Sequence, residues 1–226
     1  MLVKLEQVLS QAQVAEAQQM LTQADWVDGK TTAGHLALDC KNNLQLPPDS
    51  ETARQLGDFI LARLHDHPLF NSAALVNKVL PPMFNCYQSA GEFGNHIDNA
   101  IRFVPNSAIK IRTDISITVF FSEPESYQGG ELIIEDTYGQ QSVKLKAGDA
   151  VLYPSTSTHR VTPVTKGRRL ASFFWIQSLI RRDDQRRILF DLDQSIQRLT
   201  AAKQSSEEVI KLSGIYHNLL RQWSET

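Results

Sequence analysis

The order of apolar and polar residues divides the chain into three stretches with different periodicities. In the first, apolar residues recur at helical spacing after a capping-box pair, Ser10 and Gln13. These apolar positions are Val14, Ala17, Leu21 and Ala24. A second helix is expected over residues 50–65, because apolar residues there again form one stripe. That stripe contains Leu56, Phe59, Ile60 and Leu64. The pattern predicts a helical N-terminal region, residues 1–74, that packs on the rest of the protein.

Between residues 75 and 178 the period changes to two. In the segment "IRTDISITVFF" every second position is apolar, a pattern that gives one buried face only in a strand. The alternating residues are Ile111, Ile115, Ile117, Val119 and Phe121. Further short apolar segments follow, separated by turns that contain Gly, Pro or Ser. Several short strands at this spacing predict a double-stranded β-helix (jelly roll) or a related barrel, so the fold class is α+β.

Residues 179–226 return to helical spacing. Two apolar stripes are separated by a second capping-box pattern, Ser205 and Glu208. They are Leu189, Leu192, Ile196 and Leu199, and then Val209, Leu212, Tyr216, Leu219 and Trp223. This pattern predicts a C-terminal helical hairpin. Such a hairpin could cover the β core or form a homodimer, and the sequence does not decide between these two roles.

A candidate metal site begins in "GEFGNHIDNAIR", where His96 and Asp98 stand two residues apart. In a strand these two side chains point to the same face. His159 is the candidate third ligand, because it lies late in the β region, where a jelly roll brings distant strands together. Two histidines and one carboxylate with open coordination positions match the site of non-haem Fe(II) oxygenases. Taken alone, this spacing is a weak signal.

The other four histidines are less suitable as ligands. His65 and His67 fall on the predicted second helix about 200° apart, so we expect solvated surface residues. His35 and His217 have no acidic or histidine companion at a useful spacing, so we expect structural roles for both.

Two arginines could meet anions. In "RRLASFFWI", Arg169, Ala171, Phe173 and Trp175 share one strand face, while Arg168 points the other way. A guanidinium can hold the far carboxylate of a 2-oxoacid with two charge-assisted hydrogen bonds, although Arg169 could also be an ordinary edge-strand arginine. For Arg102 the alternatives are contact with an anionic substrate and a surface ion pair, of which we favour the ion pair.

Three segments together resemble a known family, the iron- and 2-oxoglutarate-dependent dioxygenases of the prolyl-4-hydroxylase type. They are "CYQSAGEFGNHIDNA", "IRTDISITVFFSEPESYQGGELIIED" and "VKLKAGDAVLYPSTSTHRVTPVTKGRRLASFFW". The superfamily pattern covers residues 75–178, and nearly the whole chain is similar to the bacterial PKHD-type hydroxylases linked to iron uptake.

This resemblance implies a role for each candidate residue. Fe(II) would be bound by His96, Asp98 and His159, and the distal carboxylate of 2-oxoglutarate by Arg169. Tyr87 occupies a place where many relatives direct a tyrosine hydroxyl at the same cosubstrate, and Trp175 matches a frequent aromatic residue near the metal. The chain departs from the pattern at Val119, where eukaryotic relatives often have a second tyrosine. That departure weakens any transfer of prolyl specificity.

The implied activity is hydroxylation of an unactivated C–H bond with release of succinate and carbon dioxide, with L-ascorbate as the expected reductant. The substrate can be a small molecule or a peptidyl group. Two alternatives stay open at this point. One is a cupin-like metal enzyme, either a zinc hydrolase or an isomerase. The other is a non-catalytic module that senses iron or 2-oxoglutarate.

Composition limits the partners and the compartment. The formal net charge of −2 and the pI near 6.3 argue against a broad basic surface, so we expect no nucleic-acid partner. No apolar run approaches the roughly 20 residues of a membrane helix. The start "MLVKLEQVLSQAQ" lacks signal-peptide features, and only two cysteines occur, so we expect a cytoplasmic protein with reduced thiols.

Overall fold

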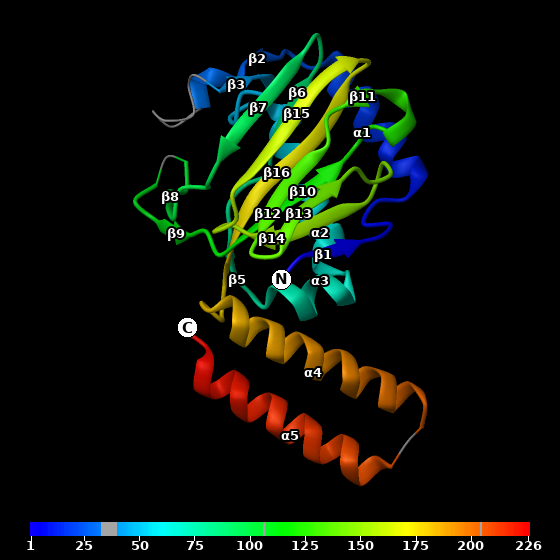
Figure 1. Ribbon diagram of the computed structural model, residues 1–226, viewed down its shortest axis with the longest axis vertical. Helices are drawn as coiled ribbons and strands as arrows, with labels where there is room; N and C mark the ends of the chain where they lie inside the picture. Colours follow the sequence, from blue (N-terminus) through cyan, green and yellow to red (C-terminus); the bar gives the residue numbers. More distant parts are fainter. Residues whose placement is uncertain (33–39, 106, 204) are drawn as a thin grey trace.

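Two antiparallel β-sheets form the centre of the molecule (Figure 1). The computed structural model describes residues 1–32, 40–105, 107–203 and 205–226. The larger sheet contains, in spatial order, β1 (Val3–Leu5), β14 (Ala150–Pro154), β10 (Ile115–Phe120), β16 (Arg169–Ser178), β6 (Met83–Tyr87), β4 (Leu44–Gln45) and β2 (Val27–Asp28), and β5 (Val76–Val79) pairs with β16. The smaller sheet contains β13 (Gly139–Val143), β12 (Leu132–Asp136), β15 (His159–Lys166), β7 (Gly91–His96) and β3 (Lys41–Asn42), and β11 (Gln128–Gly129) pairs with β15.

Apolar residues from both sheets meet in one buried cluster, so the sheets form the two layers of a sandwich. The larger sheet contributes Phe120, Val151 and Tyr153, and the smaller sheet contributes Leu132, Ile134 and Val161. This arrangement of antiparallel sheets is consistent with the predicted jelly roll.

Strand β10 has two different faces because its side chains alternate. Ile117 and Val119 belong to the cluster that also contains residues of the N-terminal helices, whereas Phe120 faces the sandwich interior. The predicted strand over residues 111–121 is divided, however. Ile111 lies in β9 (Lys110–Arg112), which pairs only with β8 (Ile101–Phe103) among the described residues. The division occurs at Asp114, whose carboxylate accepts hydrogen bonds from the Arg112 guanidinium and the Ser178 amide.

The N-terminal region contains three helices, α1 (Gln11–Gln23), α2 (Glu51–His65) and α3 (Pro68–Ala74), but it also supplies strands β1 to β4 to the two sheets, which the prediction of a helical region did not include. The short 3₁₀ helices are η1 (Gly29–Thr32) and η3 (Pro124–Ser126). Helix α1 begins with the predicted capping box, in which the Ser10 amide donates to Gln13 and the Gln13 amide donates to the Ser10 hydroxyl. The buried faces of these helices share one hydrophobic cluster with the outer face of the larger sheet.

The prediction that His67 lies on the second helix is wrong. Helix α2 ends at His65, and Pro68 drives the preceding residue into an extended conformation. His67 is therefore the N-cap of α3, and its Nδ1 accepts a hydrogen bond from the Phe70 amide at 3.4 Å. Its side chain is half-buried, whereas His65 is exposed as expected.

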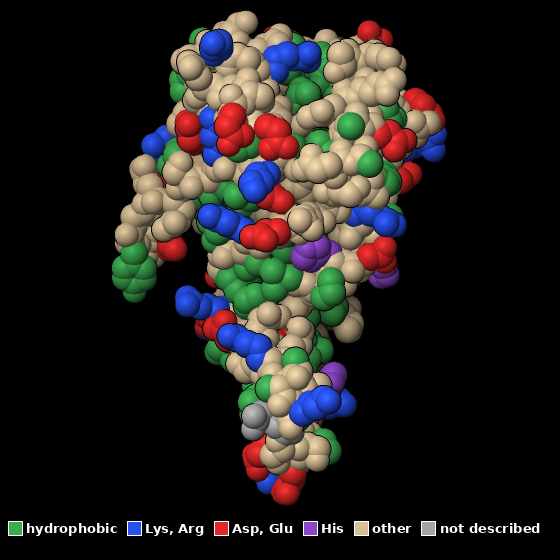
Figure 2. Space-filling view, turned by 90° about the vertical axis from the view of Figure 1, so that its right-hand side faces the viewer, with side chains coloured by type: hydrophobic (Ala, Val, Ile, Leu, Met, Phe, Trp, Pro, Cys, Tyr) green, Lys and Arg blue, Asp and Glu red, His purple; other side chains and the backbone are tan. Residues whose placement is uncertain are grey.

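The C-terminal residues form the predicted helical hairpin, which extends from the β layers as a narrow arm (Figures 1 and 2). It consists of α4 (Asp183–Ala201) and α5 (Ser206–Trp223), and α4 also contacts α3. The apolar stripes of α4 and α5 are mostly half-buried, and no residue of α5 is fully buried. Ser205 occupies the N-cap position, but its side chain makes no capping hydrogen bond, so the second capping box is absent. Glu208 instead lies 3.5 Å from the Lys211 ammonium, one turn further along α5. The homodimer through these helices stays a prediction.

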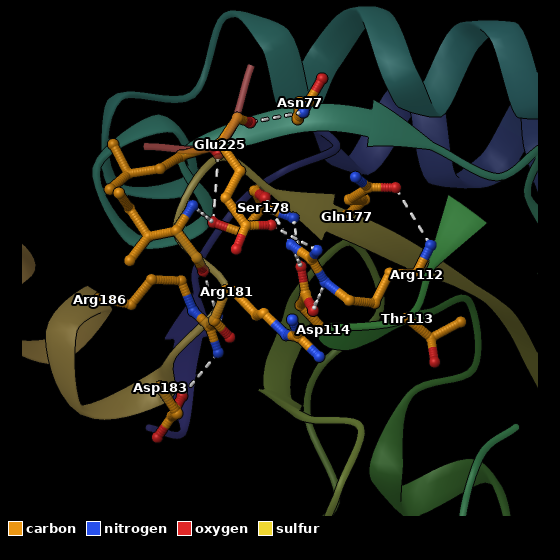
Figure 3. A network of polar contacts seen from close by, with 12 residues as sticks. Asn77, Arg112, Thr113, Asp114, Gln177, Ser178, Arg181, Asp183, Arg186 and Glu225 are labelled. Carbon is orange, nitrogen blue, oxygen red and sulfur yellow. Dashed lines mark hydrogen bonds and ion pairs between the residues drawn. The ribbon is translucent and has the colours of Figure 1, made fainter. Parts of the chain in front are cut away.

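A polar network fixes the end of this arm to the β core (Figure 3). The Arg112 guanidinium lies 2.7 Å from both the Asp114 and the Glu225 carboxylates. The Glu225 amide donates to the Leu179 carbonyl, and the Asn77 side chain donates to the Glu225 carbonyl. The chain beyond α5 is thus held beside the ends of β5 and β16.

None of the described helices is both long and apolar enough to cross a membrane. On the face shown in Figure 2, positive and negative side chains are interspersed.

Candidate metal and cosubstrate site

The three predicted metal ligands converge at one end of the smaller sheet. His96 ends β7 and His159 begins β15, and the two residues are direct partners in the ladder between these strands. Their ring centroids are 4.2 Å apart. Asp98 lies just beyond β7, and its Oδ2 is 3.7 Å from Nε2 of His159. The ligand atoms of all three residues lie within 4.8 Å of one another. Among the described residues no other group of three or more His, Cys, Asp or Glu side chains has such geometry.

Hydrogen bonds orient both imidazoles in the same way. Nδ1 of His96 lies 2.8 Å from the Gly94 carbonyl, and Nδ1 of His159 lies 3.0 Å from the Ser157 carbonyl. Because a carbonyl can only accept, each Nδ1 carries the hydrogen. The Nε2 lone pair of each ring is therefore available to a metal, as in most histidine-ligated sites.

Two serines hold the carboxylate. The Ser116 hydroxyl donates to Oδ2 of Asp98 at 2.6 Å, and the Ser155 hydroxyl lies 2.7 Å from that of Ser116. Both serines are buried on neighbouring strands of the larger sheet or directly after them. Sequence reasoning missed both, because their approach to Asp98 depends on how the two sheets pack.

Burial, together with a smaller effect of the neighbouring His159, lowers the pKa of His96 to about 4. The Phe93 ring stacks on the His96 ring with centroids 3.6 Å apart. At neutral pH His96 is therefore uncharged, which is the form that binds metal ions.

A cavity of about 630 Å³ opens beside the three ligands. Arg169 lies in its wall and is only 1 % exposed. Its Nε and Nη1 atoms have no hydrogen-bond partner among the described residues, and none of these residues forms an ion pair with it. The guanidinium carbon lies 5.4 Å from the Tyr87 ring and 5.2 Å from the Phe120 ring. A buried cation in this state is suited to an anion that enters the cavity.

Two buried tyrosines accompany this arginine. Tyr87 is the direct partner of Arg169 in the ladder between β6 and β16, and burial raises its pKa to about 12. Tyr153, on β14, lines the same cavity and meets the His159 ring edge-on at 5.1 Å. Burial also raises the pKa of Tyr153, so both hydroxyls keep their hydrogens at neutral pH. Sequence reasoning missed Tyr153, since it lies in a short apolar run, "AVLYP", without a chemical signature.

Val119 does not contribute to this part of the cavity. Its side chain belongs to the cluster on the helix-covered side of the larger sheet. Ser116 and Thr118 are the residues of β10 with the opposite orientation, and they line the cavity. The expectation that Val119 replaces a tyrosine at the site is therefore wrong, because the residue lies on the other face of the strand.

The predicted common face of β16 is confirmed for the residues that line the cavity: Arg169, Phe173 and Trp175. Arg168 points the other way, with its guanidinium 3.8 Å from the Cys86 sulfur. Trp175 is 6 % exposed, and the Phe173 ring meets it edge-on at 5.7 Å.

Arg102 is not in a surface ion pair. Its guanidinium carbon lies 4.1 Å from the centroid of the Trp175 ring, and no carboxylate among the described residues is within ion-pair distance. The interpretation failed because the Arg102 side chain lines the cavity, whereas its neighbours Ile101 and Phe103 on β8 are exposed.

The last two histidines do not contribute to the site. His217 is exposed on α5 and meets the neighbouring Tyr216 ring edge-on. His35 lies outside the described residues.

The site fits both groups that the sequence suggested. Two histidines and one carboxylate form a ligand set with open positions that suits Fe(II). The unpaired, buried guanidinium of Arg169 suits a carboxylate in the same cavity.

Comparisons with known proteins agree with this geometry. The model of the 2OG-Fe(II) oxygenase superfamily matches residues 82–177, and that of the PKHD-type hydroxylase C-terminal domain matches residues 183–225. A PKHD-type hydroxylase from Saccharophagus degradans is 58% identical over 226 residues, and the PKHD-type hydroxylase PiuC from Pseudomonas aeruginosa is 56% identical over 225 residues. Each match covers 100% of both chains. The crystal structure of a prolyl-4-hydroxylase from Pseudomonas putida matches with a TM-score of 0.53 at 17% identity, over 78% of this chain and 92% of that chain, which shows a shared fold.

Proposed function

Because this chain belongs to the PKHD-type hydroxylases and is an enzyme of the 2-oxoglutarate-dependent dioxygenase type, we propose that His96, Asp98 and His159 hold its catalytic Fe(II). We further propose that it hydroxylates an unactivated C–H bond and releases succinate and carbon dioxide. The observation that carries the proposal is the buried, unpaired guanidinium of Arg169 in the same cavity as the three ligands.

The protein's first task is to present three ligands in the right protonation state. The carbonyls of Gly94 and Ser157 hold the two imidazoles with Nε2 directed away from the backbone. The Ser116 hydroxyl fixes one carboxylate oxygen of Asp98. When bound, iron and 2-oxoglutarate supply the oxidative chemistry, which consumes dioxygen.

Its second task is to orient the cosubstrate. Arg169 can donate two parallel hydrogen bonds to the far carboxylate of 2-oxoglutarate, and these bonds are strong because both partners are charged. The Tyr87 hydroxyl, which is protonated at neutral pH, is a further donor beside Arg169. Binding of the anion would also remove the free-energy penalty of an unpaired buried cation.

Its third task is to keep water from the reacting atoms. Phe93, Phe173 and Trp175 form apolar walls of the cavity. A poorly hydrated site strengthens the electrostatic interactions inside it and protects reactive species from side reactions.

The two alternatives explain less. A cupin-like zinc enzyme would use the same three ligands, but it gives no reason for the unpaired Arg169. A sensing module without turnover does not account for the full-length similarity to proteins named as hydroxylases. Inhibition by a zinc-selective chelator would favour the first alternative, and tight 2-oxoglutarate binding without succinate formation would favour the second.

The test is an anaerobic titration of the metal-free protein with Fe(II) and 2-oxoglutarate. We expect a visible charge-transfer band from the chelated 2-oxoacid. The Arg169→Ala variant should require at least about tenfold more 2-oxoglutarate to form the band, since it loses hydrogen bonds between charged groups. Arg168→Ala is the matched control, because that side chain is directed at Cys86 and should leave the titration unchanged. Bound metal without a band, or equal titrations for both variants, would contradict the proposal.

The use of L-ascorbate and the connection with iron uptake rest on the family resemblance, the cytoplasmic location rests on the sequence, and all three stay predictions.

A further inference from the structure

The cavity has a second cationic region, on the side of the β8–β9 hairpin. Arg102, on β8, and Lys41, on β3, both line the cavity beside Asp98. Asp98 is the only acidic residue among the described residues that line it. Its carboxylate is already engaged by Ser116 and lies beside His159.

Arg102 is held in a way that leaves its donors accessible. The guanidinium carbon lies 4.1 Å from the centroid of the Trp175 ring, a cation–π contact that uses no N–H donor. Among the described residues none accepts a hydrogen bond from its side chain. The contact with Trp175 restricts the position of the guanidinium, and its N–H groups remain available to an anion in the cavity.

Lys41 adds a second positive charge to the same region. Its side chain is buried, and its ammonium lies 5.5 Å from the centroid of the Phe93 ring. Burial and, to a smaller extent, the positive charge of Arg102 lower the pKa of Lys41 to about 8, although Asp28 opposes this effect. The two cations therefore disfavour each other, and an anion placed between them would relieve that repulsion.

The charges of the proposed iron and 2-oxoglutarate are balanced without Arg102. Bound iron and Arg169 together balance Asp98 and the two carboxylates of 2-oxoglutarate. Arg102, which forms no ion pair with the described residues, therefore remains as a further positive charge within the cavity.

We propose that the substrate of this enzyme carries a carboxylate or a similar small anion, which Arg102 binds, and an apolar body that lies against Phe173 and Trp175. This inference rests on the proposed function, since it assumes that Arg169 is occupied by 2-oxoglutarate.

The test uses a matched pair of probes, phenylacetate and the uncharged phenylacetamide, which differ mainly in charge. Trp175 is the reporter, in a Trp26→Phe, Trp223→Phe background, because its ring contacts Arg102. Each probe is titrated anaerobically into the full-length protein with Fe(II) and saturating 2-oxoglutarate, and Trp175 fluorescence is recorded.

We expect phenylacetate to give a saturable change at a concentration at least about tenfold lower than phenylacetamide. Arg102→Gln should weaken phenylacetate binding by about 10- to 100-fold and leave phenylacetamide binding unchanged. Arg102→Lys should give an intermediate loss, because it retains the charge without the planar donors. Lys110→Gln is the control, since it removes a charge from the same hairpin at an exposed position over Phe103. Thermal unfolding checks that each variant is folded.

No saturable response to phenylacetate, equal responses to both probes, or an unchanged preference in Arg102→Gln would each overturn the inference. Measurements on the same samples distinguish a failure of the proposed function from a failure of the proposed substrate class. A missing charge-transfer band would count against the proposed function, whereas a normal band without preference for the acid would count only against the substrate class.

Discussion

Replacing Ser116 by Ala should weaken iron binding although Ser116 is not a ligand. Its hydroxyl donates to Oδ2 of Asp98 at 2.6 Å, and it is 2 % exposed. A serine has one hydroxyl hydrogen, and Ser116 gives it to the carboxylate. The Ser155 hydroxyl, 2.7 Å away, must therefore donate to the oxygen of Ser116. The two serines form a directed chain that ends at Asp98, the proposed metal ligand.

The size of the effect follows from this direction. A hydrogen bond to a charged group contributes about 1.5–3 kcal/mol, and about 1.4 kcal/mol corresponds to a factor of ten. Ser116→Ala should therefore weaken Fe(II) binding by about 10- to 100-fold, which agrees with the usual cost of losing a partner of a metal ligand. Ser155→Ala removes a hydrogen bond between neutral groups, about 1 kcal/mol, and should weaken binding only about fivefold.

The assay is anaerobic competition for Fe(II) against a chromophoric chelator. Ser172→Ala is the control, because Ser172 is also buried in the larger sheet but donates to the Met83 carbonyl. It should reduce thermal stability without changing iron affinity. The reasoning would be refuted if Ser116→Ala bound iron within about twofold of wild type, or if Ser155→Ala had the larger effect.

Three further predictions concern other parts of the molecule. Asp98→Ala should weaken Fe(II) binding at least about 100-fold in the same competition assay, because it removes the charged ligand; near-normal affinity would contradict its assignment. Tyr87→Phe should raise the 2-oxoglutarate requirement about tenfold in the charge-transfer titration, since one donor beside the cosubstrate is lost, and an unchanged titration would remove Tyr87 from the site. Arg186→Ala should lower the free energy of unfolding by about 2–4 kcal/mol in denaturant titrations without affecting iron binding, because the buried guanidinium donates to the Ile180 carbonyl and pairs with Asp183; no loss would show that the arm is fixed elsewhere.

Patterns with a short range were predictable from the sequence. Period two correctly placed Ile115, Ile117 and Val119 on one face of β10, although the opposite face is buried as well, and period 3.6 gave the helices of the C-terminal arm. The failures at short range have local causes. Pro68 ends α2 before His67, and the side-chain contacts of Asp114 separate β9 from β10. Both features depend on a single residue, and the periodic pattern of apolar positions carries no information about such an effect.

The site was predictable only in part, because its parts come from distant segments. His96 and Asp98 are close in sequence, but the pairing of His96 with His159 requires a specific register between β7 and β15. Neither Tyr153 nor Ser116 has a sequence signal that separates it from an ordinary strand residue. Arg102 was misinterpreted for the same reason: its neighbour Trp175 is far away in sequence.

Three arginines of this protein show why surroundings decide a role that the residue type leaves open. Arg112 is 20 % exposed and is neutralised by the carboxylates of Asp114 and Glu225. Arg186 is 2 % exposed and is satisfied by backbone carbonyls and Asp183. Arg169 is equally buried, yet two of its nitrogens have no partner among the described residues. An unpaired buried charge costs several kcal/mol, a cost that a purely structural arginine avoids, as Arg112 and Arg186 do. Arg169 therefore has the properties of a binding group, because a bound carboxylate would supply the ion pair and the hydrogen bonds that its guanidinium lacks in the folded protein.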